Sequence, residues 1–218
     1  MRGTMSAPMP FTIRQNPPML ARSTFRRTRA VFIVAALVLA ALVLTAPAAL
    51  RAQTPPSSGL QTSGPVIQST GQSYLVENPT FDVPKGHVFK SVFVINAGGG
   101  DSIKVNEQLT TVARFYNIHV RHGYDEKNVK AAAIFHGQGW PALLSDSAFA
   151  ARFGGKPNPS RKLVEELLQH GAQLVLCGQT AGARGIKREE LLPGVKVAIS
   201  AMTAMNVLQS QGFLYNPW

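Results

Sequence analysis

Cys177 is the only cysteine of the 218-residue sequence and the only source of thiol chemistry. It ends an apolar run at residues 172–177, and Gly178 and Gln179 follow it at once. If a helix or tight turn begins there, its free backbone N–H groups and positive end favour the thiolate, the reactive form of cysteine. Arg184, further along the same run, would add to that field. The pattern makes Cys177 a candidate sulfur nucleophile or carrier.

The same position also fits a structural cysteine. Free cysteine is among the most buried residue types and behaves as a small apolar side chain. Under that interpretation the protein is a non-catalytic oligomeric module that binds a small ligand or a partner protein. Accessibility of the thiol separates the two hypotheses.

Three further polar residues, Asn96, His136 and Ser200, stand where predicted strands end. In open parallel sheets ligands bind beyond the carboxyl ends of the strands, so we expect these residues and Cys177 to converge on one crevice. His136 fits either a proton donor or hydrogen-bond partner of the thiolate, or a core histidine with its hydrogen bonds satisfied.

Other motifs support less chemistry. His119 and His122 have no carboxylate or cysteine near them in the sequence, and a lone cysteine cannot build an all-cysteine site, so we predict no metal and no cofactor. The glycines at 98–100 match neither a dinucleotide fingerprint nor a phosphate-binding loop. Ser200 lacks the G-x-S-x-G elbow of serine hydrolases.

Short apolar, β-branched runs predict the strands that position these residues. They occupy residues 88–96, 130–136, 172–177 and 195–200, with a short final strand at 213–215. Strands that alternate with helices of ten or more residues indicate right-handed βαβ units. We therefore predict an α/β fold of three layers, with a mostly parallel sheet and helices on both faces.

The helices between these strands are predicted from their ends. Ser102 caps the first, and one or two short helices occupy residues 141–153. Asn158 and Pro159 begin the next helix as N-cap and first helical residue. The last helix covers residues 200–211 and is closed by glycine.

The first fifty residues have the three parts of a secretory signal. A basic stretch at 22–29 precedes a 15-residue apolar run at 30–44, and small residues follow. Because about 20 residues are needed to span a bilayer, we expect a cleaved signal peptide, 1–52, rather than an uncleaved membrane anchor. Either way the protein is exported, to the periplasm. Residues 53–87 are rich in Pro, Ser, Thr and Gly and predict a linker or extended arm, so the folded domain is 88–218.

The charge of the chain is concentrated in this leader. The sequence has 22 Lys and Arg against 11 Asp and Glu, a formal charge of +11. Seven of the bases precede Ala52 and no acid precedes Glu77, which leaves 22 − 7 = 15 bases and 11 acids, or +4, for the rest. With no aromatic and basic residues interleaved, the sequence predicts no nucleic-acid partner.

The run CGQTAGARG, residues 177–185, resembles the cysteine-bearing element of the DsrE/DsrF/TusD sulfur-relay family. A first strand with a glycine-rich turn and a central strand ending in His-Gly agree with that family. The segment LLPGVKVAISAMTAMNVLQSQGF is similar to the C-terminal part of exported DsrE-like proteins. The resemblance spans about residues 89–218.

This resemblance implies a flavodoxin-like or Rossmann-like fold, assembly into trimers or hexamers, and a cysteine that carries a persulfide sulfur. Cys177 matches the family's sulfur-bearing position. The implied partners are a sulfur donor and acceptor, either a protein or a small thiol; membrane contact is expected only if the signal is uncleaved. The residues expected around the thiol are those at the strand ends and after the cysteine: Asn96, His136, Gly178, Gln179, Arg184 and Ser200.

Overall fold

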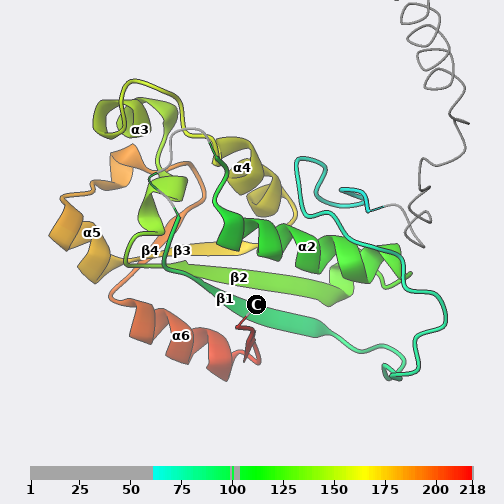
Figure 1. Cartoon of the computed structure of the whole chain (residues 1–218). Helices are drawn as coiled ribbons and strands as arrows, with labels where there is room; N and C mark the ends of the chain where they lie inside the picture. Colours follow the sequence, from blue (N-terminus) through cyan, green and yellow to red (C-terminus); the bar gives the residue numbers. More distant parts are fainter. Residues whose placement is uncertain (1–60, 99, 101–103, 218) are drawn as a thin grey trace, which may run out of the picture. The chain divides into compact units, whose positions relative to one another are not determined.

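A computed structural model describes residues 61–98, 100 and 104–217 (Figure 1). The predicted signal peptide, 1–52, and the predicted helix cap Ser102 lie outside these residues. The elements follow in this order: β1 (Phe89–Ile95), α2 (Glu107–Arg121), η2 (Glu126–Asn128), β2 (Val129–Phe135), η3 (Trp140–Leu143), α3 (Asp146–Arg152), α4 (Arg161–Gln169), β3 (Gln173–Cys177), α5 (Gly178–Arg184), η4 (Arg188–Glu190), β4 (Lys196–Ala198), α6 (Ala201–Ser210) and β5 (Leu214–Tyr215).

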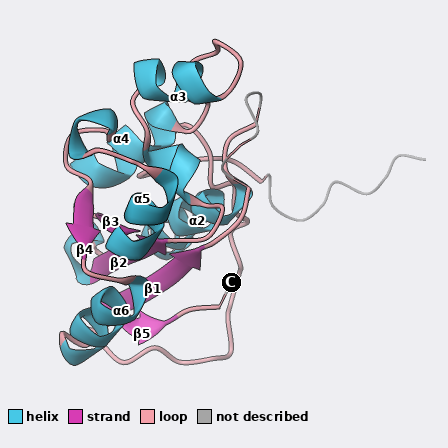
Figure 2. Cartoon of the chain, turned by 90° about the vertical axis from the view of Figure 1, so that its left-hand side faces the viewer, coloured by secondary structure: helices cyan, strands magenta, loops and turns pink. Residues whose placement is uncertain are grey.

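The five strands form one parallel sheet in the order β4-β3-β2-β1-β5. Helices cover both of its faces, with α2 and α4 on one side and α6 on the other (Figures 1 and 2). Each strand is a short apolar run, and helical crossovers join parallel neighbours because a tight hairpin cannot. The predicted three-layer α/β fold is confirmed. None of the helices in the described part of the chain is long and apolar enough to cross a membrane.

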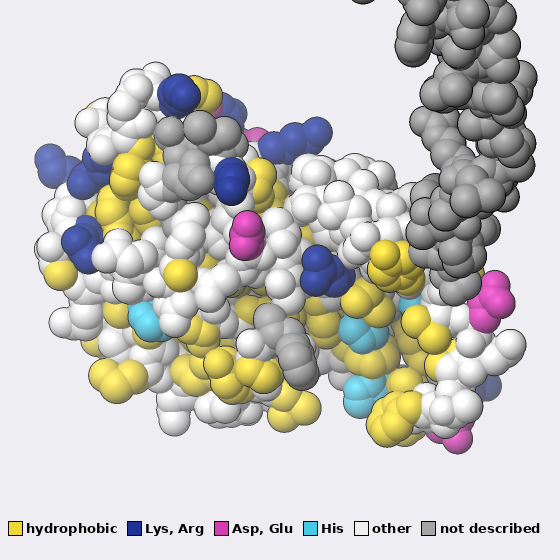
Figure 3. All heavy atoms as spheres, viewed as in Figure 1, with side chains coloured by type: hydrophobic (Ala, Val, Ile, Leu, Met, Phe, Trp, Pro, Cys, Tyr) yellow, Lys and Arg dark blue, Asp and Glu magenta, His cyan; other side chains and the backbone are white. Residues whose placement is uncertain are grey.

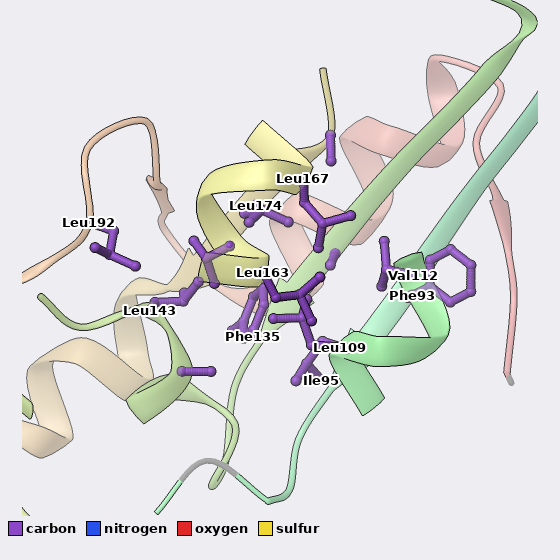
Figure 4. Close-up of a cluster of buried hydrophobic side chains, with 14 of the residues drawn as sticks. Phe93, Ile95, Leu109, Val112, Phe135, Leu143, Leu163, Leu167, Leu174 and Leu192 are labelled. Atoms are coloured by element: carbon purple, nitrogen blue, oxygen red, sulfur yellow. The ribbon is translucent and has the colours of Figure 1, made fainter. Parts of the chain in front are cut away.

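Alternate residues of β1, β2 and β3 enter two separate cores, as the two-residue period of a strand requires. Phe93, Phe135 and Leu174 pack with α2 and α4 in the larger core (Figure 4). Val92 and Ile134 face the smaller core under α6. Apolar side chains also remain exposed around α6 and β5: Ile199, Met202, Val207, Leu214 and Tyr215. The face that α6 covers is therefore the less completely buried one.

The start of α2 differs from its prediction. The helix begins at Glu107, and Asn106 caps it by accepting a hydrogen bond from the Leu109 amide at 3.0 Å. The amide side chain of Asn106 satisfies a free N–H group of the first turn and so sets this later start.

The prediction that Asn158 caps the following helix is wrong. α4 begins at Arg161, and Ser160 is its N-cap residue. The Asn158 side chain instead donates two hydrogen bonds, to the carbonyl oxygens of Ala142 (3.0 Å) and Leu144 (2.7 Å). Its side-chain oxygen accepts a hydrogen bond from the Ser160 amide at 2.9 Å, in the turn before the helix, and α4 starts two residues later than predicted.

The segment before β1, predicted as a linker or arm, lies against α2. Thr62 and Ser73 form an antiparallel bridge, and Val66 and Ile67 between them are buried in the larger core. Gly71 passes so close to α2 that a Cβ on it would lie 2.7 Å from the Ala113 carbonyl carbon. Its φ of +79° also favours glycine. Residues 62–73 are thus a docked arm.

Candidate functional site

Cys177 stands where the chain changes from one face of the sheet to the other. It is the last residue of β3 and pairs with Ala198, the last residue of β4. After β3, Ala181 of α5 packs into the larger core, whereas after β4, Ala204 of α6 packs into the smaller one. Neighbouring parallel strands whose connections leave to opposite faces open a crevice at their carboxyl ends, the usual ligand site of such sheets.

The first residues of two helices, α5 and α6, lie close to the sulfur of Cys177. Burial raises the pKa of the Cys177 thiol, but the backbone amides of Thr180, Ala201 and Gln179 and the Thr180 hydroxyl approach the sulfur, and together they lower its pKa below that of free cysteine. Cys177 makes no well-aligned capping hydrogen bond with α5. The thiolate is therefore stabilised by several N–H and O–H dipoles acting together.

Cys177 is 6% exposed and yet belongs to neither hydrophobic core. Its surroundings are polar backbone groups at helix starts, which differ from the aliphatic packing of a purely structural cysteine. The thiol is consequently activated and largely buried.

Gly178, predicted as a binding residue, has a packing role. A Cβ at this position would lie 2.5 Å from the Ala198 carbonyl oxygen and 3.0 Å from that of Ile199. Only glycine lets β4 approach the start of α5 this closely. This approach places Ala201 beside the sulfur.

Gln179 and Ser200 shape the turn that leads from β4 into α6. The Gln179 side-chain amide donates to the Ile199 carbonyl oxygen at 3.1 Å. Ser200 is the N-cap of α6 and accepts a hydrogen bond from the Thr203 amide at 3.0 Å. The two side chains fix the backbone corner that presents the Ala201 amide to Cys177.

Asn96 and His136 lie at the same edge of the sheet. Phe135 pairs with Leu176, so His136 and Cys177 are the next residues on two neighbouring strands. Asn96 is held by Gln108 of α2, which accepts from the Asn96 amide (2.8 Å) and donates to its side-chain oxygen (3.0 Å). Neither residue is among the groups that shift the pKa of Cys177.

Arg184 is the last residue of α5 and so lies at the opposite end of that helix from the thiol. It is exposed, and its carbonyl oxygen accepts a hydrogen bond from Arg152 at 3.3 Å. The lowered pKa of Cys177 has its causes in the helix starts and not in this guanidinium.

The residues nearest the sulfur were only partly predictable. Thr180 lowers the pKa of the thiol through its hydroxyl and its backbone amide, and Ala201 does so through its backbone amide. Neither residue forms a recognisable sequence motif. The signal for Thr180 was its place three residues after Cys177, where the N–H groups of a new helix are unpaired. Among the residues described, no group of three or more His, Cys, Asp or Glu could hold a metal ion.

Comparison with solved structures finds two proteins to which the chain is similar. A protein of unknown function from Methanobacterium thermoautotrophicum aligns with 22% identity and a TM-score of 0.43, over 60% of this chain and 99% of its own. The ychN protein from E. coli aligns with 18% identity and a TM-score of 0.35, over 59% of this chain and 97% of its own. No match was found among curated proteins.

The sequence model of one family matches residues 90–215, which is more than half of the chain and includes every strand but the first residue of β1. The match contains Cys177 and the segments that surround it. The chain belongs to the DsrE/DsrF-like family.

Proposed function

We propose that this protein is an exported, homo-oligomeric sulfur carrier or sulfurtransferase that accepts a sulfane sulfur on Cys177 and passes it to an acceptor thiol. The observation that supports this most is the set of N–H and O–H groups from two helix starts that lowers the pKa of the thiol. The family is of the sulfur-relay type, which agrees with this role.

The transfer needs no oxidant or reductant beyond its two partners. The Cys177 thiolate attacks the outer sulfur of a donor persulfide; a new sulfur–sulfur bond forms on Cys177, the donor's sulfur–sulfur bond breaks, and the donor leaves as a thiolate. An acceptor thiolate then attacks the outer sulfur on Cys177 and restores the Cys177 thiolate. The helix-start N–H groups stabilise the thiolate before the first step and after the second.

Two features support the other parts of this proposal, which are export and oligomerisation. The leader at residues 1–52 has the pattern of an export signal. Exposed apolar side chains such as Ile199, Met202 and Leu214 gather around α6 and β5, as expected of a face that contacts other subunits.

The proposal is tested by loading the mature protein with a persulfide or polysulfide donor and measuring its intact mass. We expect a gain of one sulfur atom, reversed when an acceptor thiol is added. Light scattering on the same preparation should report a mass several times that of one chain.

Cys177→Ser is the control, because it keeps the size of the side chain and removes the only thiol. We expect no gain in mass from this variant. Absence of any adduct on the wild-type protein with a range of donors would remove the sulfur-carrier role and favour a binding module with a structural cysteine.

A further inference from the structure

A pocket of 560 Å³ lies at the edge of the sheet opposite Cys177. It is enclosed by the segment that follows the docked arm, residues 75–83, together with Phe89 at the start of β1 and the last turn of α2. In Figure 3 hydrophobic and histidine side chains gather at this end of the visible face. Its volume is in the range of small-molecule sites, which is about 300–1,000 Å³.

The lining is mainly apolar and continues onto the surface. Phe81 is 86% exposed, Val76 55% and Leu75 49%, and Val83, Phe89 and Ile118 complete this side of the pocket. Single exposed apolar residues are ordinary, but a contiguous group around a hollow marks an interaction site.

Arg121 is the one Lys or Arg among the residues that line the pocket, and none of the lining residues is an acid; Glu77 and Asp82 of the enclosing segment are exposed. Arg121 is half-buried, and it donates hydrogen bonds to the Ser73 hydroxyl and to carbonyl oxygens of the docked arm, all of them neutral groups. It forms no ion pair with any residue in the described part of the chain. Burial lowers the pKa of the neighbouring His119, so its imidazole is uncharged near neutral pH and Arg121 supplies the charge.

The wall of the pocket is held in place without a ligand. The Val76 amide donates to Nε2 of His122 at 2.9 Å, and Nδ1 of the same ring lies 2.6 Å from the Ile118 carbonyl oxygen. The Phe89 ring packs against His119, with 4.0 Å between ring centroids. A preformed site loses less conformational entropy on binding.

We propose that this pocket binds a single-chain amphiphile with a carboxylate head, its apolar chain packed against Phe89 and Val83 and its head beside Arg121. Charge complementarity selects this ligand: the lining offers an apolar surface and one guanidinium that pairs with no carboxylate of the described residues, and a carboxylate matches it in charge. The site is independent of the proposed function, because it lies at the other edge of the sheet from the thiol.

Calorimetric titration of the mature protein with octanoate, decanoate and dodecanoate, each as monomers below micelle formation, tests this. We expect saturable binding that tightens about threefold to fourfold with each added methylene until the pocket is full. Dodecanol and dodecyltrimethylammonium, which have the same chain with a neutral or a cationic head, should bind at least about tenfold more weakly.

Two variants, one of them a control, locate the site, and a third tests the role of the head group. Phe81→Ser changes a side chain that is 86% exposed and should weaken dodecanoate binding severalfold while the fold is kept. Leu214→Ser, on β5 and 75% exposed, is the matched control and should bind as the wild type does. Arg121→Gln should remove the preference for carboxylate over alcohol; if it fails to fold, the head-group comparison on the wild type decides the same point.

Three results would overturn the proposal: no saturable binding, equal affinity for the three head groups, or equal weakening by Phe81→Ser and Leu214→Ser. Binding to phospholipid vesicles without binding of monomeric dodecanoate, or a pocket covered by a second copy so that Phe81→Ser changes only the oligomeric state, would also overturn it. Cys177→Ser should bind dodecanoate normally, which separates this outcome from that of sulfur loading.

Discussion

Replacing Asn117 by alanine should lower the free energy of unfolding by about 3–5 kcal/mol. Asn117 of α2 is fully buried, and its side chain binds only backbone groups of the docked arm. Its oxygen accepts from the amides of Val66 (3.1 Å) and Ile67 (2.8 Å). Its nitrogen donates to the carbonyl oxygens of Ile67 (2.9 Å), Thr70 (3.1 Å) and Gly71 (3.0 Å). Alanine would leave these peptide groups buried without partners.

Denaturant unfolding and amide exchange measure the effect of Asn117→Ala. Residues 62–73 should lose protection first, and the melting temperature should fall by about 10–15 °C. Glu166→Ala is the control: this carboxylate also binds the arm, at the amides of Gln68 (3.2 Å) and Ser69 (3.1 Å), but at an exposed site. It should cost less than about 1 kcal/mol, because water replaces exposed hydrogen bonds. Equal losses from the two variants would contradict the assigned role of Asn117.

Gly178→Ala should cost about 2–3 kcal/mol and slow the reaction of Cys177 with alkylating reagents. The added Cβ would lie 2.5 Å from the Ala198 carbonyl oxygen, so β4 must move away from the start of α5. That movement withdraws the Ala201 amide from the sulfur and raises the pKa of the thiol.

Gly182→Ala is the matched control in the same helix. A Cβ there meets nothing within 4 Å, and alanine favours a helix over glycine by about 0.5–1 kcal/mol. We expect this variant to be slightly more stable than the wild type, with unchanged alkylation. Chemical denaturation and labelling rates of both variants check the pair, and a harmless Gly178→Ala would contradict the close-packing role.

The sequence predicted the elements whose signals are local. β1, β2 and β3 are apolar runs bounded by polar turns, and their alternation with helices requires a parallel sheet. Cys177 could be selected because it is unique and ends a strand. These features depend on composition and spacing, which a single sequence contains.

Features that depend on contacts distant in the sequence could not be predicted in this way. Asn117 reads as an ordinary polar residue of a helix, although it binds peptide groups about fifty residues earlier in the chain. Asn158 has the local pattern of a helix cap, but its side-chain nitrogen binds the carbonyl oxygens of residues 142 and 144, and its oxygen binds the Ser160 amide in the turn before α4. Gly178 and Ala201 act through backbone positions that only the packed sheet brings together.

The pH dependence of Cys177 alkylation in the native protein tests the central claim most directly. Because the pKa of the folded thiol is lowered, the thiolate persists as the pH falls below the pKa of free cysteine and is lost only below the folded value. We predict rapid labelling whose midpoint lies below that of free cysteine and moves upward in Thr180→Val, which lacks the hydroxyl that approaches the sulfur. A midpoint at or above that of free cysteine, or labelling only after unfolding, would contradict the account.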